Sequence, residues 1–172
     1  MEPVRDEAVA QMKRRGVPRH LFPQHAHWDW AAKADLLRLL ATCAFAIECD
    51  GEWQGAMMTS TAGHFARLDP DRGKPGVYVK YIESAPWNLA QLNPAPRYGA
   101  IGTRLIEAAV RLSVDENFRG RVGLHSLPNP DTQSFYERCG MVCLGVDPDV
   151  EHLPYYEMTR ERATLFLTGG NL

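Results

Sequence analysis

The chain has 172 residues, of which 45% are hydrophobic and 23% are charged, and its formal net charge is -2. This length and composition indicate one globular domain over residues 1–172 and exclude a disordered chain. The slightly acidic balance provides none of the basic surface that nucleic-acid binding normally requires.

The N-terminus and the cysteines indicate a cytoplasmic protein. The N-terminal residues are charged, and no apolar run approaches the roughly 20 residues that span a bilayer, so neither secretion nor membrane contact is expected. No CxxC pair occurs, and all cysteines lie among apolar residues, as buried thiols of a reducing compartment do: Cys43, Cys49, Cys139 and Cys143.

The first part of the chain predicts two helices separated by an irregular segment. The first helix covers 2–15 and ends before Gly16 and Pro18. After the segment 17–28, Asp29 can cap a second helix from Trp30 to about Ala41. This helix is expected to be partly buried through Leu36, Leu37, Leu39 and Leu40.

The middle of the chain predicts an antiparallel hairpin and a central strand. Strands over 44–49 and 52–61 are joined at Asp50-Gly51, a dipeptide that suits a tight turn. The run from Val77 to Ile82, continuing to Ser84, is rich in β-branched and aromatic residues. The proline-containing connection 87–96 has no periodicity, and long loops of this kind often serve function.

The remainder predicts alternating strands and helices. The clearest helix runs from Ala100 to about Val114, because Ile101, Leu105, Ala108 and Leu112 recur on one face. Further on we expect strands at 121–127, 141–145 and 154–159 and helices at 131–139 and 160–167. The order of elements predicts an α/β protein with a partly parallel sheet.

Small residues mark the turn before the clearest helix, within the segment Arg97, Tyr98, Gly99, Ala100, Ile101, Gly102 and Thr103. Backbone N–H groups at a helix start, together with the helix dipole, can hold a phosphate or a diphosphate. Glycines at such a place also occur simply because a turn requires them. On its own, the segment leaves both interpretations open.

Two motifs in order resemble the GNAT (Gcn5-related N-acetyltransferase) family. Arg97, Ala100 and Gly102 match its diphosphate loop, Q/R-x-x-G-x-G/A, with alanine at the usual first glycine. The run Asn129–Met141 is similar to the family's N-x-x-A-x-x-F-Y-x-x-x-G-F, with Ser134 and Met141 as mild departures. The resemblance covers roughly 44–167.

The resemblance implies a mixed, mostly antiparallel sheet flanked by helices, with parallel central strands at 77–84 and 121–127 that splay apart. Acetyl-CoA would be the co-substrate, its pantetheine arm in the opening and its diphosphate on residues 97–103. A backbone N–H near Ser84 or Ala85 could hold the oxyanion of the tetrahedral intermediate. Asn129 could contact the pantetheine arm, or it could simply cap the following helix.

The resemblance also implies N-acetyl transfer by direct attack of a primary amine in a ternary complex. Tyr136 is the candidate donor of a proton to the departing thiolate, or it simply packs its ring in the core. Glu83 is the candidate acceptor of the amine proton, directly or through water, although a carboxylate at a strand end can also be solvated surface. His125, beside Ser126, is the alternative acceptor or a structural histidine. Cys139 and Cys143 have no histidine at a catalytic spacing and are expected in the core.

No metal is expected, because His20, His25 and His27 have no fourth ligand nearby and the family needs none. The amine acceptor is open, and a macromolecular one, a protein N-terminus or charged tRNA, is an alternative to a small molecule. Trp28, Trp30 and Trp87 could line an aromatic acceptor pocket or pack in the core. The rival to an enzyme is a catalytically silent acyl-CoA-binding regulatory module, and a homodimer is among the possible assemblies.

Overall fold

The computed structural model describes residues 2–14, 16–18, 22, 28–89, 93 and 95–169. Within these residues one mixed sheet has the strand order β1-β2-β3-β4-β6-β5. The strands are β1 (Thr42–Cys49), β2 (Glu52–Ser60), β3 (Val77–Ser84), β4 (Val122–His125), β5 (Val142–Asp147) and β6 (Leu153–Met158). The helices are α1 (Glu2–Arg14), α2 (Trp30–Ala34), α3 (Ile101–Asp115), α4 (Pro130–Arg138) and α5 (Arg160–Thr168), with short 3-10 helices η3 (Asp35–Arg38) and η4 (Pro86–Asn88).

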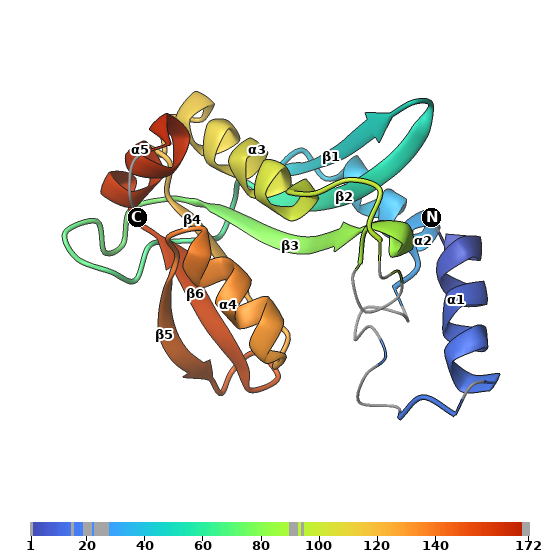
Figure 1. Ribbon diagram of the computed structural model, residues 1–172. Helices are drawn as coiled ribbons and strands as arrows, with labels where there is room; N and C mark the ends of the chain where they lie inside the picture. The colour runs from blue at the N-terminus through green and yellow to red at the C-terminus, as the bar shows by residue number, and fades with distance from the viewer. Residues whose placement is uncertain are drawn as a thin grey trace.

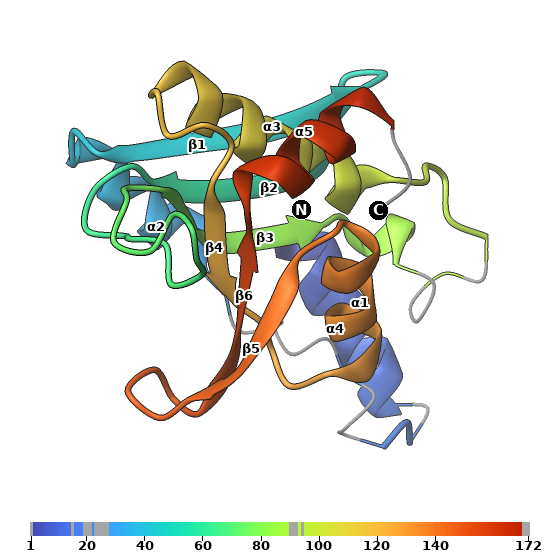
Figure 2. The ribbon, with the colours of Figure 1, turned by 90° about the vertical axis from the view of Figure 1, so that its left-hand side faces the viewer.

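The sheet is antiparallel except between β3 and β4, which confirms the expected mixed, mostly antiparallel architecture. These two parallel strands pair only from Val77↔Val122 to Val79↔Leu124. β3 then continues to Ser84, whereas β4 ends at His125. The two halves of the sheet, β1–β3 and β4–β6, therefore diverge, as Figures 1 and 2 show. The divergence leaves one edge of β3 without a partner strand.

A β-bulge changes which side chains of β3 face each side of the sheet. Met58 pairs with Tyr81 but Thr59 pairs with Val79, so Lys80 is the extra residue. Side chains alternate along a strand, and the extra residue shifts that alternation by one. As a result Tyr78, Tyr81 and Glu83 share the face opposite α3.

Helix α3 covers the other face and supplies much of the core. Its buried side chains are Ile101, Leu105, Ile106, Ala109, Val110 and Ser113. Ala108 and Leu112, which the periodicity placed on the buried face, are only partly buried against the core. The helix lies close to β2, because a Cβ atom on Gly55 would come within 2.6 Å of the Ile101 Cγ2 atom.

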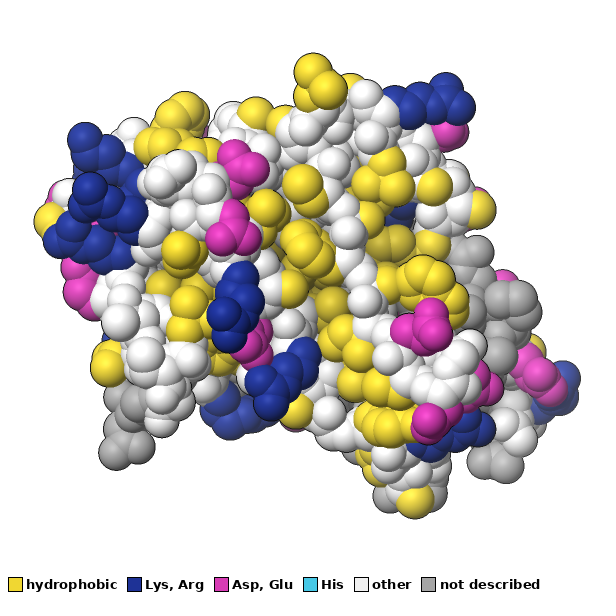
Figure 3. All heavy atoms as spheres, turned by 90° about the horizontal axis from the view of Figure 1, so that it is seen from above, with side chains coloured by type: hydrophobic (Ala, Val, Ile, Leu, Met, Phe, Trp, Pro, Cys, Tyr) yellow, Lys and Arg dark blue, Asp and Glu magenta, His cyan; other side chains and the backbone are white. Residues whose placement is uncertain are grey.

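The outer face of α3 carries charged side chains. Glu107 accepts hydrogen bonds from Arg104 at 2.7 Å and from Arg111 at 2.7 Å. Seen from above, basic and acidic side chains are interspersed on the surface (Figure 3). In the part of the chain that the structure describes, no helix has both the length and the apolar character that a membrane span needs.

Three expectations from the sequence were wrong. The helix expected from Trp30 to Ala41 stops at Ala34, and η3 follows it. The backbone at Leu39 is already extended, with φ -81° and ψ 123°, because the chain turns there towards β1. Leu37, Leu39 and Leu40 are consequently exposed rather than partly buried. Cys143, expected in the core, is also exposed.

Candidate active site

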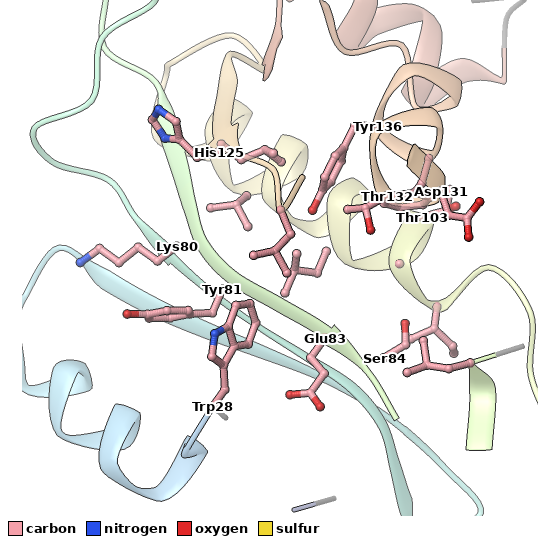
Figure 4. A pocket seen from close by; sticks show the side chains of 18 of the residues that line it. Trp28, Lys80, Tyr81, Glu83, Ser84, Thr103, His125, Asp131, Thr132 and Tyr136 are labelled. Carbon is pink, nitrogen blue, oxygen red and sulfur yellow. The ribbon is translucent and has the colours of Figure 1, made fainter. Parts of the chain in front are cut away.

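A cavity of about 790 Å³ occupies the opening between β3 and β4. Its walls come from β3 between Tyr78 and Ser84, the turn and first residues of α3, the inner side of α4, Lys33 of α2, and Trp28 just before that helix. In Figure 4, Tyr136 of α4 enters from one side, and Trp28, Tyr81 and Glu83 lie on the opposite side. The cavity thus joins both sequence motifs to the face of the sheet opposite α3.

The N-terminus of α3 opens onto this cavity without a protein cap. Ala100 occupies the N-cap position, no side chain caps the helix, and its first turn holds no acidic residue. In contrast, Asp29, Asn129 and Thr159 each accept a hydrogen bond from the first turn of α2, α4 and α5. The first backbone N–H groups of α3 have no partner within the helix, so they can bind an anion in the cavity.

Ala100 has a left-handed backbone conformation, with φ 60° and ψ 14°. This conformation costs an L-residue about 1–2 kcal/mol and costs glycine almost nothing, although glycine loses more entropy on folding. We expect Ala100→Gly to raise the free energy of unfolding by about 0.5–1 kcal/mol, measured by urea denaturation. The control Ala108→Gly, inside the helix, should lower it by about 1 kcal/mol. Equal losses in the two variants would contradict the assignment of strain to Ala100.

The turn before α3 is anchored to neighbouring segments. The Tyr98 N–H donates to Asn88 Oδ1 at 3.0 Å, and the Tyr98 hydroxyl donates to Asp50 at 2.5 Å. Arg97 donates to Glu52 at 2.5 Å and does not line the cavity, unlike Tyr98, Gly99 and the residues that follow. Arg97 therefore holds the turn against the β1–β2 hairpin.

Gly102 allows the two sequence motifs to meet. A Cβ atom at this position would lie 2.9 Å from the Phe135 Cζ atom. Its absence lets α4 approach the first turn of α3, with Phe135 against Gly102 and Tyr136 beside the cavity. Close packing against Phe135 is therefore a reason for the glycine at 102 that sequence reasoning did not consider.

Tyr136 is almost completely buried, at 4% exposed, yet its side chain lines the cavity. Its ring packs against those of Phe135 and Tyr156, and its hydroxyl points into the cavity (Figure 4). Burial raises the pKa of this phenol well above its ordinary value of 10.0. The hydroxyl therefore stays protonated at neutral pH and can act as a proton donor.

The unpaired edge of β3 presents one of the two backbone groups expected to face the thioester. The Ala85 N–H donates to the Gln54 carbonyl at 2.8 Å, and it therefore cannot donate to an oxyanion in the cavity. Alternate residues of a strand direct their N–H groups to opposite sides, and the Ser84 N–H therefore points to the opening.

Asn129 caps α4 by accepting a hydrogen bond from the Asp131 N–H at 2.9 Å, and it does not line the cavity.

Glu83 lines the cavity but is only 2% exposed. It accepts a hydrogen bond of 2.5 Å from the indole N–H of Trp30. Beside it, the rings of Trp28 and Tyr81 lie 5.1 Å apart, and Lys33 Nζ is 3.9 Å from the centre of the Tyr81 ring. These aromatic side chains form a wall of the cavity.

Trp87 is not part of that wall. Its indole N–H donates to the buried Gln54 side chain at 2.8 Å, and Trp87 does not line the cavity. Of the three tryptophans singled out in the sequence, Trp28 lines the cavity and Trp30 bonds to Glu83.

His125 belongs to a polar cluster that sequence reasoning did not assemble. The His125 cluster, as we call it, comprises His64, Arg67, Tyr78, His125, Asp147, Tyr155 and Glu157. Its members come from β3, β4, β5, β6 and the β2–β3 connection, so no local pattern links them. The one signal was Gly123, since an isolated glycine in a strand often marks a close approach. A Cβ atom there would lie 2.4 Å from His64 Nε2 and 2.4 Å from the Tyr155 hydroxyl.

The charges in the His125 cluster are arranged so that Asp147 is ionised and His64 is neutral at pH 7. Hydrogen bonds from Arg67 and His125 lower the pKa of Asp147 to about 2. Burial, with the nearby charge of Arg67, lowers the pKa of His64 to about 4. At neutral pH, His64 therefore adds no positive charge beside His125.

The lowered pKa of His64 should make stability depend on pH. Between about pH 6.5 and pH 4, the unfolded chain binds a proton at His64 that the folded protein does not. The free energy of unfolding should therefore fall as the pH is lowered through this window, by an amount on the order of 2–3 kcal/mol. In urea denaturation at pH 7.5 and pH 5, His64→Gln should flatten the dependence, whereas His152→Gln at an exposed position should retain it. A dependence unchanged by His64→Gln would refute this origin.

Metal ligation has no support among the described residues. No three histidine, cysteine, aspartate or glutamate side chains within them gather as a metal site. His20, His25 and His27 lie outside the described residues.

Cys139 is buried, and this burial raises the pKa of its thiol to about 11. A thiol in this state is a poor nucleophile at neutral pH.

The fold is shared with solved acetyltransferases, although no family model and no curated protein sequence matches the chain. A bacterial toxin has a TM-score of 0.58 and 15% identity, covering 83% of this chain and 80% of its own. Aminoglycoside 6'-acetyltransferase type Ii has a TM-score of 0.52 and 18% identity, covering 92% of this chain and 91% of its own. The Bacillus subtilis N-acetyltransferase YlbP, in complex with coenzyme A, has a TM-score of 0.51 and 11% identity, covering 78% and 84%. The fold class expected from the two motifs is thereby confirmed.

Proposed function

We propose that this chain is a single-domain, cytoplasmic N-acetyltransferase that moves the acetyl group of acetyl-CoA to a primary amine. The observation that carries the proposal is the uncapped N-terminus of α3, which opens onto the same cavity as the Tyr136 hydroxyl. The cavity thus combines an anion-binding helix N-terminus with a proton donor. The solved neighbours support it, since one is an aminoglycoside acetyltransferase and another an N-acetyltransferase with coenzyme A.

The coenzyme would enter along the edge of β3 that β4 leaves free. Its diphosphate would accept hydrogen bonds from the first N–H groups of α3, favoured by the helix dipole. Its pantetheine arm carries amide groups and could pair with residues 80–84 of β3 as an added strand does. The thioester would then lie in the cavity, between Tyr136 and the face opposite α3.

The reaction would be a direct attack. The lone pair of the amine forms the C–N bond at the thioester carbon, and the Ser84 N–H can stabilise the resulting oxyanion. When the C–S bond breaks, Tyr136 gives its proton to the thiolate. Glu83 and His125 both line the cavity and are the side chains considered to accept the amine proton. An acyl-cysteine step is disfavoured, because Cys139 is buried and protonated.

The test is an assay of the full chain with acetyl-CoA and a panel of amines. Release of the coenzyme A thiol and mass spectrometry of the acetylated amine report transfer. The panel should include aminoglycosides, because two neighbours are described as aminoglycoside acetyltransferases, together with small aromatic amines and peptide N-termini. Turnover with any amine supports the enzyme. A thermal shift with acetyl-CoA but no transfer would favour the silent binding module, and the absence of both would refute the proposal.

A further inference from the structure

A chain of three hydrogen-bonded side chains leads from the cavity wall into the protein. The Tyr78 hydroxyl lies 2.7 Å from His125 Nδ1, and His125 Nε2 lies 3.1 Å from Asp147 Oδ2. Tyr78 and His125 line the cavity, and Asp147 lies behind them at 8% exposed. His125 directly follows Leu124, the last β4 residue that pairs with β3, so the chain lies where the strands part.

The partners of His125 assign its tautomer. Asp147 also accepts a hydrogen bond of 2.7 Å from Arg67, and with its pKa at about 2 it is a carboxylate at neutral pH. A carboxylate can only accept, so His125 Nε2 carries the proton that it donates. Nδ1 of the neutral ring is then the acceptor, and the Tyr78 hydroxyl is its donor. The two hydrogen bonds therefore run in one direction, from Tyr78 in the cavity wall through His125 to Asp147.

The surroundings hold the imidazole in this orientation. The Tyr155 ring lies 5.0 Å from that of His125, and the Arg67 guanidinium is 4.0 Å from the centre of the Tyr155 ring. Glu157 accepts hydrogen bonds from the Tyr155 hydroxyl at 3.2 Å and from the backbone N–H of Arg67 at 2.7 Å. His64 lies on the same side, neutral at pH 7 and bonded to the Tyr155 hydroxyl at 3.2 Å. The Arg67 guanidinium is thus paired with Asp147, and a new positive charge on His125 would face the same carboxylate.

We propose that Tyr78, through His125 and Asp147, accepts the proton of the acceptor amine; this rests on the proposed acetyl transfer. As the amine nitrogen bonds to the thioester carbon, its N–H proton moves to the Tyr78 oxygen, and the Tyr78 proton moves to His125 Nδ1. The imidazolium is stabilised by Asp147 and later loses its proton to solvent. The thiolate takes the Tyr136 proton, which solvent replaces, so that amine and thioester give amide and thiol. Tyr78 is then a catalytic residue, and Asp147 is a positioning residue.

The decisive comparison is between Tyr78→Phe and Tyr156→Phe. Each variant loses one phenol hydroxyl, but Tyr156 lies outside the His125 cluster and does not line the cavity. We expect Tyr78→Phe to lower kcat about 100-fold with the KM for acetyl-CoA unchanged, and Tyr156→Phe to remain within about threefold of the parent. Glu83→Gln tests the rival hypothesis that Glu83 accepts the amine proton. A full loss in Glu83→Gln with parent-level kcat in Tyr78→Phe would overturn the relay.

Asp147→Asn provides a second measurement, the pH profile of kcat, which would not change if Asp147 had only a structural role. Without the carboxylate, the imidazolium is less stable, so the acid limb of the kcat profile should move to lower pH while kcat falls. A lower kcat with an unmoved acid limb would overturn the role of Asp147. Transfer by the parent separates the two proposals: its absence overturns both, whereas intact transfer in Tyr78→Phe overturns the relay alone.

Discussion

Replacing Tyr136 with phenylalanine is expected to lower kcat for acetyl transfer by about 100- to 1,000-fold, the range that loss of a general acid commonly causes. The thiolate would then leave without a proton from the protein. The ring would keep its contacts with Phe135 and Tyr156, and no described residue bonds to the hydroxyl, so the fold should be unaffected. Steady-state kinetics with acetyl-CoA measure the loss, and the KM for acetyl-CoA should change little.

Tyr156→Phe is the matched control for this experiment. Tyr156 is 1% exposed, its ring centre lies 5.6 Å from that of Tyr136, and it does not line the cavity. Removing its hydroxyl should leave kcat near the parent value. If Tyr136→Phe turned over as fast as Tyr156→Phe, Tyr136 would not be the proton donor.

Introducing a negative charge at the start of α3 is expected to weaken acetyl-CoA binding about 100-fold without harming the helix. Thr103 lies in the first turn of α3 and lines the cavity. An aspartate at this position would improve the helix dipole interaction by about 0.3–1 kcal/mol. The same carboxylate would repel the diphosphate by about 3 kcal/mol at roughly 6 Å, which corresponds to about a 100-fold loss of affinity.

Thr103→Asn isolates the charge in that experiment, because asparagine has nearly the same shape as aspartate. Calorimetric titration with acetyl-CoA should show affinity within a few-fold of the parent for Thr103→Asn and a large loss for Thr103→Asp. Urea denaturation should show that Thr103→Asp is at least as stable as Thr103→Asn. Equal affinities of the two variants would place the diphosphate elsewhere.

The sequence predicted the frame of this site because its signals are local. The Asp50-Gly51 turn, the apolar periodicity of α3 and the β-branched run of β3 each lie within one segment, and all three elements formed as expected. The segment 97–103 led to the turn that opens onto the cavity. The helix after Trp30 was overestimated because its leucines satisfy a helical pattern, whereas the start of β1 requires the chain to extend at Leu39.

The His125 cluster could not be predicted, because its geometry depends on register. The bulge at Lys80 puts Tyr78 and Glu83 on one face, and no residue pattern in β3 announces it. Asp147 and Arg67 are 80 positions apart in the chain and meet only when β5 takes its place at the edge of the sheet. Pairwise contacts of this kind follow from the fold and not from any local preference.

A crystal structure of the protein with coenzyme A is the most direct test of the proposed site. The diphosphate oxygens should lie within hydrogen-bonding distance of the backbone N–H groups at Gly102 and Thr103, with the pantetheine arm along β3 and the sulfur beside Tyr136. Coenzyme A bound at another surface, with the first turn of α3 empty, would contradict the assignment of this cavity to acetyl transfer.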